Sequence, residues 1–245
     1  MNVAVIPARA GSMRIPNKNI KLFAGRPVIA YSIEAAQCAG IFDRILVSTD
    51  SETIARIAMQ CGAEVPFLRP AELADDHTPT APVVAHTLHW LTASGSPAEY
   101  VCCIYATAPF VRPEYVIEGY RLLTEHKVSS VFSVAPFPFP IFRALQIAED
   151  GHMAMCWPEY ELTRSNDLPV TYHDAGQFYW LACDAFLQDK KMYGRDALPV
   201  MVPRYLVQDI DTPEDWETAE HMFHALQLRK ASWAGEKRTQ RQERP

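Results

Sequence analysis

The sequence has little of what marks a secreted or membrane-bound protein. Its 245 residues include six cysteines, and no two of them form the Cys-x-x-Cys pair of a zinc or redox motif. No apolar run reaches the roughly 18 residues that a membrane helix needs. The N-terminus also has no charged segment followed by an apolar one, the pattern of a secretion signal. We therefore expect a cytoplasmic protein with no membrane partner, in a reducing compartment.

Two further absences narrow the function. The chain contains neither G-x-G-x-x-G nor G-x-x-x-x-G-K-[ST], the glycine patterns of dinucleotide sites and P-loops. Its net charge of −6 argues against a general nucleic-acid binder. A polyanionic ligand is still possible where positive charge is concentrated locally.

What is present is the alternating pattern of an α/β domain. Hydrophobic residues make up 49% of the chain and charged residues 21%, an ordinary composition for a globular protein. Apolar runs predict strands at 3–6, 44–48, 64–68, 100–105, 129–135, 172–183, 200–202 and 205–207. Helical periodicity predicts helices at 27–39, 82–93, 113–125 and 213–228, with another beginning near residue 51. Strands that alternate with helices predict a mostly parallel sheet in a three-layer α/β/α arrangement.

The loop at residues 6–19 is the clearest candidate site. It follows the first strand, and it contains Arg9, Arg14 and Lys18 but no acidic residue. Gly11 and Ser12 allow the backbone to approach a ligand closely. In an open α/β sheet, ligands bind at the carboxyl ends of the strands. Cationic side chains and free backbone N–H groups at that edge suit a polyphosphate. The alternative is a solvated surface loop.

Acidic residues follow two other predicted strands. Asp50 ends the second strand, and we favour a role in capping the next helix over a contact with substrate. Asp209 and Asp211 lie in a segment that we expect to be extended, in which residues i and i+2 point the same way. Two converging carboxylates suit a Mg²⁺ ion that takes its other ligands from phosphate and water. Asp211 also precedes a helix start that Thr212 can cap, and the two roles are compatible.

Several motifs together resemble one enzyme family. The opening run Ile-Pro-Ala-Arg-x-Gly-Ser-x-Arg-Ile-Pro-x-Lys-Asn at residues 6–19 is similar to that of the CMP-sialate cytidylyltransferases, in their pseudaminate branch. The resemblance extends to about residue 225. The other motifs that carry it are Ser48-Thr49-Asp50, Leu68-Arg69-Pro70-Ala71-Glu72-Leu73-Ala74, Thr107-Ala108-Pro109-Phe110, Phe137-Pro138-Phe139-Pro140-Ile141, Tyr172-His173-Asp174-Ala175-Gly176-Gln177-Phe178-Tyr179 and Asp209-Ile210-Asp211-Thr212-Pro213-Glu214-Asp215.

The resemblance implies a fold, a reaction and a set of site residues. The fold would be a Rossmann-like nucleotidyltransferase sheet. The reaction would transfer CMP from CTP to the anomeric hydroxyl of pseudaminic acid, a nine-carbon ulosonic acid, with release of pyrophosphate, for surface or flagellar glycans. The residues implied for the nucleotide are Ala8, Arg9, Ala10, Gly11, Ser12, Lys18, Asn19, Arg69 and Thr80. Those implied for the sugar are Tyr105, Thr107, Arg164, His173, Asp174 and Gln177. Arg9, Lys18 and Asp211 would be catalytic, and Asp209 and Asp211 would hold Mg²⁺. The general base is not identified.

The domain boundaries combine pattern and resemblance. Residues 1–229 are expected to form a single domain, with an arm at about 137–172 inserted into it. Pro138 and Pro140 exclude a helix or a central strand at the start of the arm. By resemblance, the arm crosses to a second subunit, which implies a homodimer. Residues 230–245 are basic and without period, and we expect a disordered tail.

Two residues depart from the family pattern. Met13 stands where the family generally has lysine, and Ala106 where it usually has proline. These departures leave open a CTP-binding homologue that does not catalyse. Within the enzyme class, N-acetylneuraminate, legionaminate and a keto-deoxy-octonate remain alternative acceptors.

Overall fold

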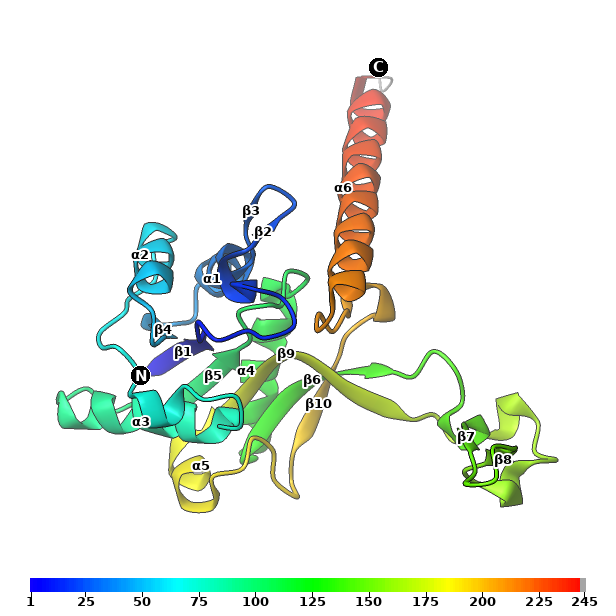
Figure 1. Cartoon of the computed structure of the whole chain (residues 1–245). Coiled ribbons are helices and arrows are strands. Elements are labelled where there is room, and N and C mark those ends of the chain that lie inside the picture. Colours follow the sequence, from blue (N-terminus) through cyan, green and yellow to red (C-terminus); the bar gives the residue numbers. More distant parts are fainter. Residues whose placement is uncertain (243–245) are drawn as a thin grey trace.

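A six-stranded sheet forms the centre of the protein (Figure 1). The computed structural model describes residues 1–242, and for 230–242 it describes the backbone only. The strands, in spatial order, are β10 (Leu198–Met201), β6 (Ser130–Pro136), β9 (Tyr172–Ala182), β5 (Tyr100–Ile104), β1 (Asn2–Pro7) and β4 (Arg44–Ser48). β1 pairs in parallel with both β4 and β5, and β10 pairs in parallel with β6. β9 runs antiparallel between β5 and β6. The prediction of a mostly parallel sheet is confirmed.

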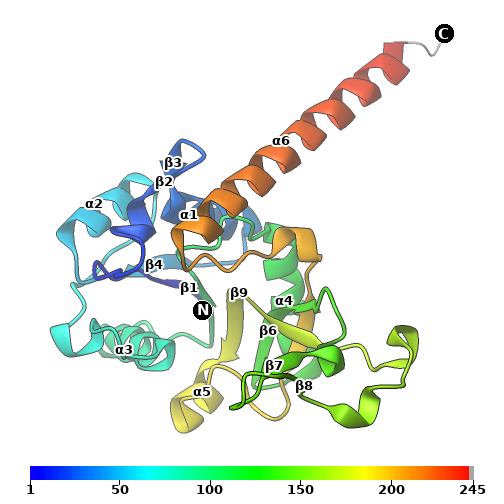
Figure 2. The same cartoon turned by 45° about the vertical axis from the view of Figure 1, so that its right-hand side comes forward.

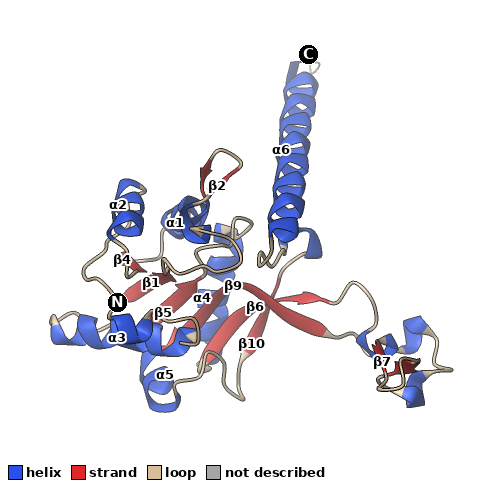
Figure 3. Cartoon of the chain, viewed as in Figure 1, coloured by secondary structure: helices blue, strands red, loops and turns tan. Residues whose placement is uncertain are grey.

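Helices cover both faces of this sheet (Figure 3). One face packs on α1 (Val28–Ala39), α2 (Glu52–Gln60) and α4 (Pro113–His126), and the other on α3 (Thr80–Ala93) and α5 (Cys183–Asp189). Alternate residues of a strand point to opposite faces. In β1, Ala4 and Ile6 join the core cluster under α1, whereas Val3 and Val5 join the cluster under α3. The predicted three-layer α/β/α arrangement is therefore confirmed.

Short sequence signals fix the ends and the packing of these helices. Gly40 ends α1 in the left-handed region, at φ 64°. The side chain of Ser51 caps α2 by accepting a hydrogen bond from the backbone N–H of Ile54. Gly119 lets α4 approach β9, because a Cβ atom there would lie 2.7 Å from Cδ1 of Trp180. Gly40 and Ser51 therefore set helix ends, and Gly119 sets how closely α4 packs on the sheet.

Three of the predicted elements are wrong, two in type and one in length. Residues 64–68 form only two isolated bridges, from Glu64 to Leu46 of β4 and from Leu68 to Thr49 just beyond it, since Pro66 cannot donate a ladder hydrogen bond. Residues 205–207 are not a strand: a 3-10 turn, Arg204–Leu206, follows Pro203 and buries Leu206. Helix α6 runs over Pro213–Gln242, well past residue 228, where we had ended it. Residues 243–245 of the predicted tail lie outside the described residues.

The segment between β6 and β9 projects away from the sheet, as Figures 1 and 2 show from two directions. It carries a small hairpin of β7 (Leu145–Ile147) and β8 (Met153–Met155). A second hairpin, of β2 (Leu22–Phe23) and β3 (Arg26–Pro27), follows the first loop. The projecting segment presents apolar side chains to solvent, and Phe139 and Leu162 are 80% and 94% exposed. No helix in the described part of the chain is both long and apolar enough to span a membrane.

Candidate active site

A cavity of about 540 Å³ lies where the first loop, the loop before α3 and the start of α6 meet. It opens beside the carboxyl ends of β1 and β5, the edge at which the sequence predicted a ligand site. The lining residues are Pro7, Arg9, Ser12, Met13, Arg14, Lys18, Asn19, Arg69, Asp76, Thr78, Thr80, Val83, Tyr105, Thr107 and Asp211. The fold therefore brings most of the predicted nucleotide residues into one cavity.

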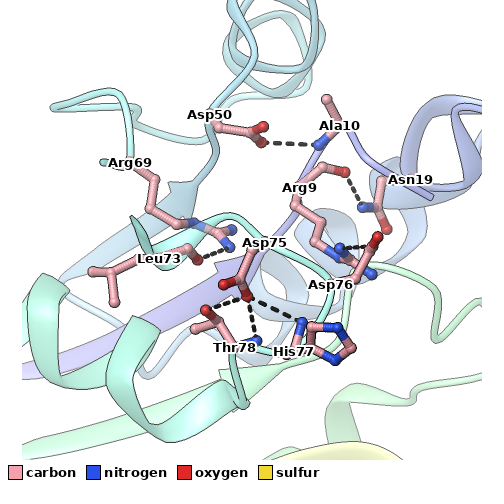
Figure 4. Close-up of polar contacts among 10 residues, drawn as sticks. All are labelled: Arg9, Ala10, Asn19, Asp50, Arg69, Leu73, Asp75, Asp76, His77 and Thr78. Atoms are coloured by element: carbon pink, nitrogen blue, oxygen red, sulfur yellow. Dashed lines mark hydrogen bonds and ion pairs between the residues drawn. The ribbon is translucent and has the colours of Figure 1, made fainter. Parts of the chain in front are cut away.

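Two side chains, one after β4 and one at the end of the first loop itself, hold the backbone of that loop (Figure 4). Asp50 Oδ1 accepts a hydrogen bond from the backbone N–H of Ala10, at 2.8 Å. Asn19 Nδ2 donates to the backbone carbonyl of Arg9, also at 2.8 Å. Our preference for Asp50 as a helix cap was wrong, because Ser51 caps α2 and Asp50 supports the loop. The parallel pairing of β1 with β4 is what brings Asp50 beside the loop.

The cations of the first loop are paired with two aspartates across the cavity. Lys18 Nζ lies 3.1 Å from Asp211 Oδ1, and Arg14 Nη2 lies 2.9 Å from Asp211 Oδ2. Arg9 Nη1 is paired with Asp76 Oδ1. Three cations thus face two carboxylates here, which leaves an excess of positive charge to attract an anion.

Arg69 is buried at the other end of the cavity, with 6% of its surface exposed. Its guanidinium donates to the backbone carbonyls of Ser48 and Leu73 and to Ser48 Oγ. Burial lowers the pKa of Arg69, and the charge of Asp50 partly offsets that effect. These bonds use three of the five N–H donors of arginine, so two remain for a ligand.

The loop before α3 has a defined shape of its own. Asp75 Oδ1 accepts hydrogen bonds from the backbone N–H groups of His77 and Thr78 and from Thr78 Oγ1, at 3.0, 2.6 and 2.7 Å. Hydrogen bonds from Thr78 lower the pKa of Asp75. This turn places Thr78 and Asp76 at the cavity, two residues that we did not predict. The sequence signal for them is the run of two aspartates and a threonine after Arg69.

The predicted sugar residues divide into two groups. Tyr105 and Thr107 line the cavity, and Tyr105 Oη lies 3.2 Å from Thr80 Oγ1 at the start of α3. Four others do not line it. Arg164 lies on the projecting segment, where its Nε donates to Asp167 at 2.7 Å.

The remaining three sugar candidates lie on β9 and bond to protein groups. Gln177 is buried, and its Nε2 donates to a backbone carbonyl at 2.5 Å, while its Oε1 has no partner among the described residues. Asp174 accepts hydrogen bonds from the hydroxyl of Tyr179 at 2.6 Å and from a backbone N–H at 2.8 Å. His173 Nδ1 lies 2.8 Å from the carbonyl oxygen of Asp174. Within this single chain, none of the three lines the cavity, so their role stays a prediction.

The two late aspartates differ in position. Ile210 between them is buried at 1% exposure, so the chain does alternate as we expected, although the segment is not part of a strand. Asp211 lines the cavity and Asp209 does not. Burial raises the pKa of Asp209, and the charge of Asp211 raises it further. The two carboxylates are therefore close enough to affect each other's charge, which is consistent with Asp209 and Asp211 sharing a divalent cation.

The start of α6 holds Asp211 in place. Asp215 Oδ2 accepts hydrogen bonds from the backbone N–H groups of Asp211 and Thr212, at 3.1 and 2.7 Å, and its own N–H donates to Thr212 Oγ1. The predicted capping by Thr212 is confirmed. No group of three or more His, Cys, Asp or Glu in the described part of the chain forms a complete metal site. A cation here would therefore need ligands from phosphate or water in addition to the carboxylates.

The chain is similar in sequence to enzymes that transfer cytidylyl groups. The model of the cytidylyltransferase family matches residues 3–238. The pseudaminic acid cytidylyltransferase of Campylobacter jejuni is 37% identical over 222 residues, which cover 91% of this chain and 96% of that protein. The CMP-N,N'-diacetyllegionaminic acid synthase of Legionella pneumophila is 34% identical, over 92% of this chain and 97% of that one.

Solved structures agree on the fold. A structure of CMP:2-keto-3-deoxy-manno-octonic acid synthetase complexed with CTP superposes with a TM-score of 0.68 at 16% identity, over 91% of this chain and 98% of that one. At this identity the likeness supports the fold alone. The family match and the extent of the curated relatives together show that the chain belongs to the cytidylyltransferase family.

Proposed function

We propose that this cytidylyltransferase transfers CMP from CTP to the anomeric hydroxyl of pseudaminic acid and releases pyrophosphate, in the synthesis of surface or flagellar glycans. The observation that carries the proposal is the cavity itself, which combines the cationic first loop, Arg69 and Asp211 at one edge of the sheet. The choice of acceptor is supported by the 37% identity to the pseudaminic acid enzyme over almost the full length of both chains.

The nucleotide would lie along the first loop. Its phosphates would contact Arg9, Lys18 and the small residues Ala8, Ala10, Gly11 and Ser12. The backbone N–H groups of Ala8, Ala10 and Ser12 already donate to Ser48, Asp50 and Ala10, so among these four residues the N–H of Gly11 is left for phosphate. Asn19 and Asp50 fix that backbone in advance, so little ordering is left to be done on binding. The cytosine would lie toward Arg69 and Thr80, where the guanidinium retains free N–H donors for an acceptor edge of the base.

Asp209 and Asp211 fit Mg²⁺, since hard carboxylate oxygens are the ligands it prefers. The ion, when bound, would neutralise phosphate charge during the displacement. Lys18 and Arg14 orient the carboxylate of Asp211 and keep a positive field over the phosphates. In the transfer, the sugar oxygen attacks the α-phosphorus in line and pyrophosphate leaves. Positioning and charge neutralisation by Arg9 and Lys18 are the main contributions of the chain.

The acceptor would lie beside Tyr105 and Thr107. Its carboxylate would need a cation, and arginine matches a carboxylate in a bidentate way. Arg164 does not line this cavity in its own chain, and it belongs to the projecting segment. We infer that the protein is a homodimer in which the projecting segment reaches a second copy. The six free thiols fit a reducing cytoplasm.

Pyrophosphate release with CTP and Mg²⁺ tests the reaction, with pseudaminate, N-acetylneuraminate and legionaminate offered in parallel. We expect release with pseudaminate. Release with another acceptor alone would keep the chemistry and overturn the substrate. Binding of CTP with no release for any acceptor would favour the non-catalytic homologue.

Lys18 gives a residue-level test of the site. Replacement by methionine should lower kcat/KM about a hundredfold, as expected when one preorganised contact to the transferring phosphate is lost. Lys191→Met is the matched control, since Lys191 is an exposed residue just after α5 and does not line the cavity. Equal activity of the two variants would show that the nucleotide lies elsewhere.

The dimer can be tested separately by sedimentation equilibrium. Ile147 is 74% exposed on β7, and Ile147→Asp should give a monomer without unfolding the chain. Met59 is 53% exposed on α2 and away from the projecting segment, so Met59→Asp serves as control. A wild-type protein that sediments as a monomer at assay concentration would contradict the inference.

A further inference from the structure

The ion pair between Arg9 and Asp76 joins two loops that the reaction uses for different purposes (Figure 4). Arg9 lies on the first loop, assigned above to the phosphates. Asp76 lies on the loop between Arg69 and α3, which forms the side of the cavity assigned to the base. Both side chains line the cavity, and they are 32% and 43% exposed.

The loop that carries Asp76 is held at two points. At its start, Arg69 Nη1 donates to the carbonyl of Leu73 at 3.3 Å. In its middle, the Asp75 carboxylate accepts three hydrogen bonds from the two residues after Asp76. A carboxylate on such a loop has a fixed position, unlike one on a mobile surface segment. The pair with Arg9 therefore costs less side-chain entropy than an ordinary surface ion pair.

The geometry of the pair leaves Arg9 able to bind phosphate. The recorded contact uses Nη1 alone. Arginine carries five N–H donors in a rigid planar fork, so holding one nitrogen fixes the direction of the others. The nitrogens Nη2 and Nε remain available for an incoming anion. Asp76 does not have to be displaced when the triphosphate arrives.

Asp211 offers a contrast within the same cavity. It pairs with Arg14 and Lys18, but it is also a predicted metal ligand, so its partners change when a cation binds. Asp76 is not one of the predicted metal ligands, and its partner in the structure is Arg9. Its contribution is therefore to the orientation of the arginine.

We propose that Asp76 is a positioning residue for the cytidylyl transfer, which holds the Arg9 guanidinium over the site of the triphosphate and couples the phosphate loop to the base loop. The inference rests on the proposed nucleotide site. It predicts that Asp76 acts only through Arg9, and that it contributes to CTP binding and to turnover without touching the nucleotide.

A double-mutant cycle tests this directly, with CTP affinity measured by calorimetry and kcat and KM measured by pyrophosphate release. Asp76→Ala alone should weaken CTP binding about tenfold, the range found for residues that share one polar network. In the Arg9→Ala background the same change should have almost no further effect. Asp76→Asn should recover part of the loss, because its amide oxygen can still accept from Nη1. Asp189→Asn, an exposed aspartate on α5, controls for the change in net charge.

The outcomes separate the inference from the site assignment. If Arg9→Ala leaves CTP affinity unchanged, the proposed nucleotide site is wrong. If Arg9→Ala weakens binding and Asp76→Ala adds to it by an independent factor, Asp76 has a structural role only and the inference fails. If Asp76→Ala tightens CTP binding, the carboxylate competes with phosphate for Arg9 and the inference is also overturned. Thermal unfolding of each variant shows whether any loss comes from a folding defect.

Discussion

Met13 provides the sharpest test of how charge is arranged in the cavity. Its side chain is 81% exposed and lines the cavity between Ser12 and Arg14. The CMP-sialate cytidylyltransferases, which the sequence resembles, generally have lysine at this position. Arg14, its neighbour, pairs with Asp211 at 2.9 Å, at the end of the cavity where we propose that the phosphates bind. Met13→Lys should therefore add a cation close to the triphosphate.

The expected gain is modest, because the position is open to solvent. Two unit charges about 4 Å apart interact by about 1 kcal/mol in bulk water. That free energy corresponds to about a fivefold change in affinity. Salt screens exposed charges over about 10 Å at 0.1 M ionic strength, so the gain should shrink as salt is raised.

The assay is calorimetric titration of CTP into wild type, Met13→Lys, Arg14→Ala and the double variant, at low and high salt. Met13→Lys should tighten CTP binding about fivefold at low salt. Arg14→Ala should weaken it, and the added lysine should recover most of that loss. If the lysine has no effect in wild type but restores binding in Arg14→Ala, Arg14 already supplies the charge. No effect in either background would refute the reasoning that residue 13 lies beside the phosphates.

Three further predictions concern the framework around the site. Asp215→Ala should cost about 1 kcal/mol of unfolding free energy at neutral pH by removing a helix cap. The hydrogen bonds from Thr212 lower the pKa of Asp215 in the folded protein. Its contribution to stability is therefore complete above the pKa of the unfolded chain and is lost as the pH falls through the pKa of the folded protein. Urea titrations at several pH values will check this. Gly119→Ala should destabilise the protein by about 1 to 3 kcal/mol through overpacking against the tryptophan of β9, and an unchanged urea midpoint would contradict the packing argument. Tyr179→Phe removes the hydroxyl that donates to Asp174, and the KM for the acceptor should rise about tenfold while the Kd for CTP stays constant.

Local patterns in the sequence predicted most of the sheet. The apolar runs at 3–6, 44–48 and 100–105 are buried on both faces of the sheet, and such continuous runs are typical of parallel strands. Gly40 ends α1, and Ser51 and Thr212 cap α2 and α6, through local chemistry that needs no distant partner. Two of the three errors occurred at 64–68, which contains Pro66, and at 205–207, which follows Pro203, because proline cannot donate a backbone hydrogen bond. The third was the end of α6, which runs past residue 228.

The candidate site could be predicted only in part. The basic loop and the spacing of Asp209 and Asp211 are visible in the sequence, since each lies within a few residues. The supporting contacts are not. Asp50 bonds to Ala10 across 40 residues of sequence, and the pairs of Arg9 and Lys18 span 67 and 193 residues. No local pattern encodes which acidic residue meets which cation.

The sequence alone therefore determined the class of fold and the family, because both depend on periodicity and on short motifs that act locally. The tertiary structure decided which charges share the cavity. It placed Asp76 against Arg9, paired Asp50 with the backbone of the first loop rather than with a helix end, and paired the carboxylate of Asp174 on β9 with the hydroxyl of Tyr179. The physical reason is that electrostatic contacts depend on distance in space. That distance follows from the parallel pairing of strands and from the loops that their carboxyl ends bring together.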